Sequence, residues 1–140
     1  MDTTRTPSVR VIPSPTAPMP TPTPTPLGAQ YITNAMMASA INASTGQATQ
    51  YTTNFTVNQR IYVTFALNTG DQGGAVCIQW YLNNQHNSDY AFPVAKNQFY
   101  NSYAYTSMSS PGNGDVEVYW ASTVACTDEA LAQHATFTVS

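Results

Sequence analysis

The sequence predicts an all-β protein in which two sheets pack face to face as a sandwich. The clearest sign is Ala75–Leu82, where apolar residues alternate with others and place Trp80 on an apolar face. A period of two with β-branched and aromatic residues is typical of a half-buried strand. Arg60–Asn68 and Asp115–Trp120 alternate in the same way, and clusters of turn residues separate these runs.

The elements before the central strand follow from composition. Gln30–Asn42 is rich in small residues, but its Thr, Ile and Tyr content favours a strand over a helix. We expect a turn at Ala43–Gln47. Phe55–Val57 then leads into the strand Arg60–Asn68, and the Gly-rich Asn68–Gly74 forms the next loop.

The elements after the central strand are shorter. Ser88–Val94 reads as an edge strand because of Pro93, and Gln98–Met108 is the next strand. Ser110–Gly114 has the composition of a tight turn before Asp115–Trp120.

The C-terminal segment completes the predicted fold. We expect a helical turn at Asp128–Ala132 and a last strand at Gln133–Ser140. About seven short strands separated by turns predict an immunoglobulin-like Greek-key sandwich.

The chain divides into two parts by composition. Residues 7–26 contain eight of the ten prolines, mixed with Thr, Ser and Ala, which predicts an extended polyproline-II spacer. We therefore expect an N-terminal arm and linker over 1–28 and one sandwich domain over 29–140.

Charge and hydropathy exclude several partners. Residues 29–140 carry two basic side chains, Arg60 and Lys96, against six acidic ones, a net charge of −4. Because no basic patch could neutralise phosphates, we expect no nucleic-acid partner. There is no apolar run near 18 residues and no signal-peptide pattern after Met1, so we expect no membrane insertion within this segment. We interpret the start as a cut in a longer secreted or membrane-anchored protein.

An even number of cysteines, two, in a charge-poor domain with a Thr/Pro stalk suggests an oxidising compartment. Cys77 begins one predicted strand and Cys126 follows another, and in immunoglobulin-like order the two lie at the same end of the sandwich. A disulfide between them would close a loop of about 50 residues and add about 4 kcal/mol of stability. Asn42 and Asn54 each begin an Asn-X-Ser/Thr triplet that permits N-glycosylation.

The segment Ser8–Ile12, before the spacer, has two interpretations. It is the tail of whatever precedes this domain, or it is a strand that pairs with the sheet edge of a neighbouring molecule. In the second case Val9, Val11 and Ile12 would mediate self-association.

The chain resembles a group of bacterial C-terminal modules, which are small immunoglobulin-like sandwiches on Thr/Pro stalks outside the membrane. The resemblance rests on the stalk and on four sequence stretches: Tyr31–Asn34, Arg60–Phe65, Ile78–Asn83 and Pro111–Trp120, with a similar final strand at Ala135–Val139. Some of these modules end secreted proteins and others end membrane-anchored signalling proteins. The resemblance implies a place outside the cell, and it supplies no catalytic residues.

Candidate catalytic residues are few. His86 is expected in a polar turn and His134 outward on the last strand, and no nucleophile motif accompanies either. His86 and Asp89 would offer only two metal ligands. We therefore expect surface histidines, no metal, no cofactor and no enzymatic activity.

One group of outward residues suggests a ligand. By alternation, Gln79 and Tyr81 face away from the core on one strand, and Glu117 and Tyr119 do so on its neighbour. Two tyrosine faces with two polar groups could bind a sugar chain, or the tyrosines could be ordinary cross-strand pairs. The sequence thus predicts an extracellular recognition or adhesion module that binds polysaccharide or another surface protein. The alternative is a subunit of an extracellular fibre that assembles through the arm.

Overall fold

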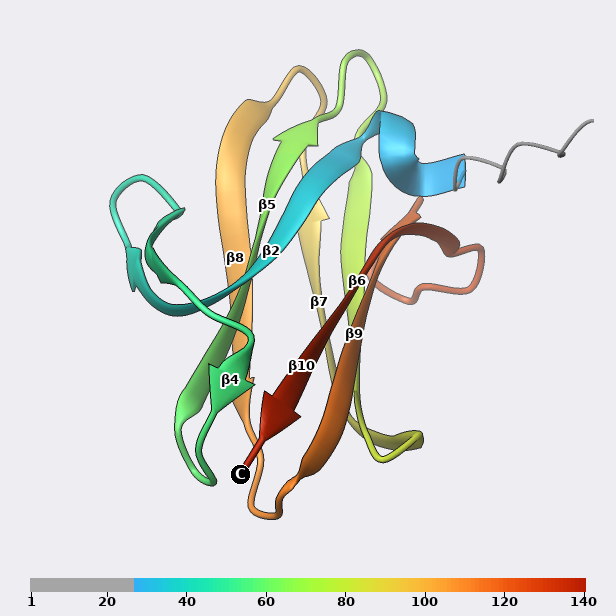
Figure 1. Cartoon of the computed structure of the whole chain (residues 1–140). Helices are drawn as coiled ribbons and strands as arrows, with labels where there is room; N and C mark the ends of the chain where they lie inside the picture. The colour runs from blue at the N-terminus through green and yellow to red at the C-terminus, as the bar shows by residue number, and fades with distance from the viewer. Residues whose placement is uncertain (1–26) are drawn as a thin grey trace, which may run out of the picture.

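Nine strands form two packed, mostly antiparallel sheets in the computed structural model, which describes residues 27–140 (Figure 1). A short 3-10 turn, η1 (Leu27–Gln30), precedes them. The strands are β2 (Ile32–Asn42), β3 (Gln47–Tyr51), β4 (Asn54–Phe55), β5 (Arg60–Asn68), β6 (Gly74–Leu82), β7 (Gln85–Val94), β8 (Phe99–Ser107), β9 (Gly112–Ala121) and β10 (Ala130–Val139). This all-β, immunoglobulin-like sandwich confirms the fold class.

The strands form a five-stranded and a four-stranded sheet, which pack together through their apolar faces. One sheet runs β4-β10-β9-β6-β7 and the other runs β3-β2-β5-β8. All pairs are antiparallel except β10 with β4, which is parallel. Each sheet turns its apolar side inward, so the two must pack together to remove those side chains from water.

Trp80 on β6 lies at the centre of the core and is 1% exposed. Its ring meets Phe137 of β10 edge to face at a centroid distance of 6.0 Å, and Phe137 meets Phe55 of β4 at 5.9 Å. Val76 and Ile78, on the same face of β6, are fully buried. The inward face predicted for this strand is therefore confirmed.

Two expectations about local structure were wrong. Ala130–Ala132 does not form a helical turn, because Ala130 pairs with Trp120 and extends β10 by strand pairing. A register shift between Leu131 and Gln133 absorbs the irregularity there. His86 is not in a turn either, since it lies within β7 opposite Tyr81. β3 and β4 are two short strands beyond the seven expected.

The expected disulfide is present. Cys77 and Cys126 are bonded, with their Cα atoms 6.3 Å apart and 49 residues between them in sequence. Cys126 has a positive φ of 58°, so the loop between β9 and β10 must turn sharply to reach β6. Asp128 holds that loop by accepting hydrogen bonds from the backbone and hydroxyl of Ser122 at 3.0 and 2.6 Å.

Residues 1–26 lie outside the described residues. The spacer and the arm with Val9, Val11 and Ile12 therefore stay predictions, as does the division into 1–28 and 29–140. Within residues 27–140, no helix has the length and apolar character needed to cross a membrane.

Candidate functional site

The four residues predicted to form a ligand patch lie together on the outer face of the five-stranded sheet. Gln79 of β6 pairs directly with Glu117 of β9. Tyr81 lies one row to one side of this pair and Tyr119 one row to the other, because Tyr81 pairs with Asp115 and Tyr119 is opposite Cys77. The rings are attached about 13 Å apart along the strands. This surface is called the β6–β9 face below.

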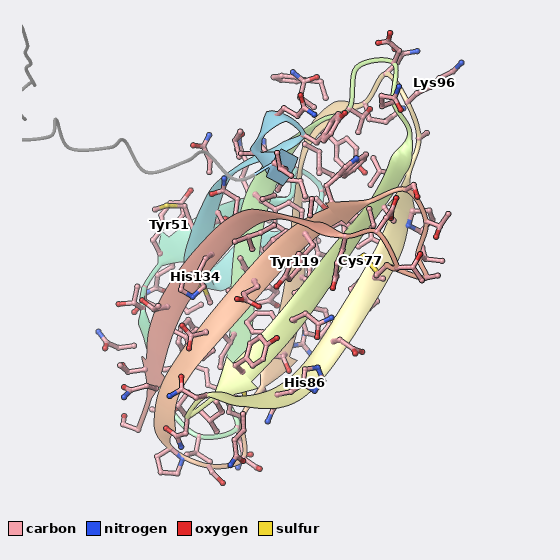
Figure 2. The ribbon with its side chains drawn as sticks, turned by 90° about the vertical axis from the view of Figure 1, so that its right-hand side faces the viewer. Tyr51, Cys77, His86, Lys96, Tyr119 and His134 are labelled. Atoms are coloured by element: carbon pink, nitrogen blue, oxygen red, sulfur yellow. A yellow bond between two sulfur atoms is a disulfide. The ribbon has the colours of Figure 1, made fainter. Side chains whose placement is uncertain are left out.

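Most of the carboxylate and histidine side chains of the described residues lie on or beside the β6–β9 face. Figure 2 shows Tyr119 and His134 on the side of the molecule toward the viewer, with Cys77 and His86 on the strands beside them. Asp115 and Glu117 come from β9, and Asp89 comes from β7.

Glu117 is the central acceptor of this face. The Tyr119 hydroxyl donates to Glu117 Oε1 at 2.8 Å. Burial raises the pKa of Tyr119 well above its usual value of 10, and the hydrogen bond to Glu117 raises it further. Burial, then the charge of Glu117, also raises the pKa of Tyr81. Both phenols therefore stay protonated at neutral pH and act as hydrogen-bond donors.

A hollow of about 350 Å³ opens beside Tyr81. It is lined by Tyr81, Asn84, Asp115, Glu117 and His134. His134 Nε2 lies 2.9 Å from Asp115 Oδ1, which fixes both side chains across β9 and β10. One aromatic ring, an amide and two carboxylates around a shallow hollow are suited to stacking on a sugar ring and bonding its hydroxyls.

A second hollow of about 310 Å³ surrounds the disulfide. Glu129 borders it, and its Oε2 is buried without a hydrogen-bond partner. Burial raises the pKa of Glu129, and the nearby charges of Glu117 and Asp89 raise it further. The ligand atoms of Cys77, Cys126 and Glu129 lie within 4.8 Å of one another. Both sulfurs are already in the disulfide and cannot act as thiolates, so this group does not fit a metal ion.

The two histidines make polar contacts of different kinds. His86 Nε2 lies 2.9 Å from Gln79 Oε1 and 3.7 Å from Asp89, and its ring meets Tyr81 edge to face. His134 pairs with Asp115 as described above. Neither histidine of the described range is hydrogen-bonded to a serine, threonine or cysteine, the side chains that a histidine activates as nucleophiles.

The two sequon asparagines are exposed. Asn42 Oδ1 accepts from the backbone of Ser44 at 2.9 Å, and Asn54 Oδ1 accepts from the Thr138 hydroxyl at 2.8 Å. Glycosylation at either position stays a prediction.

Sequence reasoning missed Asn84 and did not join Asp115 and His134 to the patch. The alternation of β9 already placed Asp115 on the face of Glu117, so that residue could have been found. His134 required the β9–β10 register, in which it lies opposite Glu117. Asn84 has a positive φ of 67° in the turn after β6, and sequence alternation does not extend into a turn.

Comparisons with known proteins give weak likenesses. No protein-family model matches the chain, and no curated protein matches it. A superoxide reductase (neelaredoxin) from Ignicoccus hospitalis is a similar solved structure, 9% identical over 64% of this chain and 76% of that one, at a TM-score of 0.40. A CARDB domain from Pyrococcus furiosus, solved in complex with di-metal ions, is 10% identical over 79% of this chain and 93% of that one, also at 0.40.

One expectation is corrected here. The sequence led us to exclude enzymatic activity, but a similar structure belongs to a superoxide reductase, which is an enzyme. The exclusion is therefore withdrawn. Neither likeness assigns an activity, a metal or a ligand to this chain.

Proposed function

We propose that the chain is an extracellular recognition module that binds polysaccharide through its β6–β9 face. The observation that carries this proposal is the hollow beside Tyr81, where an aromatic ring borders Asn84, Asp115, Glu117 and His134. Sugars offer apolar ring faces and many hydroxyls, and this lining supplies a partner for each.

The charge of the face narrows the ligand class. Asp89, Asp115, Glu117 and Glu129 lie on or beside the β6–β9 face, while Arg60 belongs to the other sheet. An anionic polymer would be repelled by this group of carboxylates. A neutral polysaccharide, or one with amino sugars, is the class that this surface would accept.

A place outside the cell is part of the proposal. The disulfide between Cys77 and Cys126 is compatible with an oxidising compartment, where such bonds persist. The Thr/Pro-rich residues 7–26 would hold the domain away from a cell surface as a semi-rigid spacer.

Retention on immobilised polysaccharides tests the proposal. We expect the full chain to be retained by at least one neutral polysaccharide and the double variant Tyr81→Ala, Tyr119→Ala to elute unretarded. Tyr51→Ala is the matched control, because Tyr51 is an exposed tyrosine on β3 of the other sheet. Circular dichroism checks that each variant is folded. Equal retention of the double variant and the parent would remove the β6–β9 face as the binding surface.

A further inference from the structure

The four outer strands of the two sheets differ in how they are protected against pairing with another chain. β4 has two residues, and β3 has five with two register shifts against β2. β7 carries Pro93 and Asp89, which oppose strand addition. β8 pairs with β5 over nine residues without any register shift, and it contains no proline, glycine or charged residue. Since proteins usually protect their edges, a long regular edge of this kind indicates a partner strand.

The hydrogen-bonding groups of β8 can be assigned from its register. The Thr69 N–H donates to the Gln98 carbonyl at 3.0 Å, so this pair is of the hydrogen-bonded type. Such pairs alternate along antiparallel strands. The N–H and C=O of Asn101, Tyr103 and Tyr105 therefore point away from β5, toward the open edge.

Part of this edge is covered by the chain itself. The turn between β2 and β3 packs closely against Asn101, so that a Cβ on Gly46 would clash with the Asn101 carbonyl oxygen. The edge at Tyr103 and Tyr105 borders a groove of about 620 Å³ between β8 and β7. The groove is lined by Trp80, Ser88, Asp89, Tyr90, Phe92 and the five residues 102–106.

The groove is suited to one extended segment with an apolar face. Five consecutive residues of β8 line it, so a strand of about five residues could follow the edge. Tyr90 and Tyr105 on its two sides are 55% and 52% exposed. On the outer side, the Arg60 guanidinium lies 4.4 Å from the Tyr105 ring centre, so a face of this one tyrosine attracts an arginine side chain.

We propose that residues 8–12 of a second copy of this chain pair with the β8 edge at Tyr103 and Tyr105. In an added strand, Val9 and Val11 would face the groove and Arg10 would face the tyrosines outside. The apolar pattern and the single charge of this segment thus match the two sides of the acceptor.

The length of the spacer favours a neighbouring molecule over the same one. As the predicted polyproline-II spacer, residues 13–26 would span about 43 Å. The spacer joins η1, which packs on β10, and β10 lies three strands from β7, about 14 Å away. If residues 13–26 form a semi-rigid spacer of that length, the arm would extend past its own groove and could reach the groove of another copy. Such head-to-tail pairing builds rings or open filaments.

Light scattering of the full chain over a range of concentrations tests this proposal. We expect the weight-average mass to rise at least twofold above the 15.1 kDa of one chain. The variant Val9→Asp, Val11→Asp should stay at the mass of one chain at every concentration. Thr3→Asp, Thr4→Asp adds the same charge outside residues 8–12 and should associate like the parent.

The acceptor is tested separately. Tyr103→Pro removes one edge-facing N–H without removing a bond to β5, and proline is tolerated at such edge positions. We expect Tyr103→Pro to be monomeric and Tyr103→Thr, which keeps the N–H, to associate. A synthetic peptide of residues 6–13 should lower the mass of the parent, whereas a scrambled peptide should not. If Tyr103→Pro does not fold, the peptide experiment tests whether the β8 edge is the acceptor.

Several results would overturn the proposal. If the parent has the mass of one chain at every concentration, the arm does not join two copies and the proposal is wrong. Unchanged association of Val9→Asp, Val11→Asp would exclude residues 8–12. Association of a folded Tyr103→Pro equal to that of the parent, or no effect of the peptide, would exclude β8 as the acceptor.

Discussion

The hydroxyl of Tyr119 donates a hydrogen bond to Glu117, with 2.8 Å between the phenol oxygen and Oε1, on the outer face of β9. This pair links the aromatic and acidic parts of the proposed binding surface. The negative charge of Glu117 also raises the pKa of Tyr81 and of Glu129.

Replacing Glu117 should change the ionisation of both tyrosines. In Glu117→Gln the carboxylate charge is gone, so we expect the pKa of Tyr119 and Tyr81 to fall toward the usual value of about 10. Alkaline titration of the tyrosine ring signals by NMR measures this. Asp71→Asn, in the loop before β6, removes the same charge at a distance and should leave both tyrosines unchanged. Equal titration curves for Glu117→Gln and the parent would contradict the assigned contact.

Glu129 should make the protein less stable as pH rises. Its pKa in the folded state is raised above the usual value of 4.5, mainly by burial. Between 4.5 and the folded-state pKa the folded protein binds more protons than the unfolded chain, so the free energy of unfolding falls as pH increases through that window. Glu129→Gln should remove this fall and be more stable than the parent at neutral pH. Urea unfolding across this pH range measures it, and a less stable Glu129→Gln would show that the carboxylate is not under strain.

Asp128 should have the opposite effect on the pH dependence of stability, because its pKa is lowered in the folded state. Hydrogen bonds from the Ser122 hydroxyl and then its backbone lower the pKa of Asp128 below its usual 3.8. The stability that this contact contributes is present above pH 3.8 and is lost as pH falls through the folded-state pKa. Asp128→Asn should therefore be less stable than the parent at neutral pH, and the difference should shrink in acid. A constant difference across pH would rule out an electrostatic origin.

Removing the disulfide should lower stability substantially. Opening a loop with 49 residues of separation costs about 4 kcal/mol in the chain-entropy model. We expect Cys77→Ala, Cys126→Ala to lose about this free energy of unfolding in urea. Val124→Ala, in the same loop but outside the bridge, should lose much less. A titration of free thiols in the oxidised, denatured parent should find none, and two titratable thiols would contradict the pairing.

Gly114 is fixed by its contact with Phe137. A Cβ at this position would clash with the Phe137 ring, and that ring is held between Trp80 and Phe55. Gly114→Ala should cost about 1 to 3 kcal/mol through overpacking. The cost should be smaller in a Phe137→Leu background, where the ring is absent. Equal costs in both backgrounds would locate the strain elsewhere.

The sequence predicted the parts of this fold that depend on alternation. β5 has the predicted bounds, and the inward faces of β6 and β9 follow from the period-two pattern around Trp80 and Trp120. The order of strands in an immunoglobulin-like sandwich predicted that Gln79 and Glu117 lie on neighbouring strands. These features were predictable because one buried face fixes every side chain of a strand.

Several features that depend on contacts between distant residues were not predictable. Gln133 Nε2 donates to the Ile32 carbonyl at 3.2 Å, and Gln133 Oε1 accepts from the Ala35 N–H at 3.4 Å, so one side chain joins the two sheets. The start of β10 followed pairing with β9 rather than local helix propensity at Ala130–Ala132. The groove between β7 and β8 exists only because their edges lie on the same side of the sandwich, which no local pattern encodes.

An NMR titration would show directly whether the β6–β9 face is the ligand-binding surface. Backbone amide shifts of the full chain would be followed while soluble neutral oligosaccharides, with an anionic one for comparison, are added. We expect saturable shifts at Tyr81, Asn84, Glu117 and Tyr119 with a neutral sugar and none with the anionic one. Shifts confined to the other sheet, or no saturable shift with any neutral sugar, would contradict the proposal.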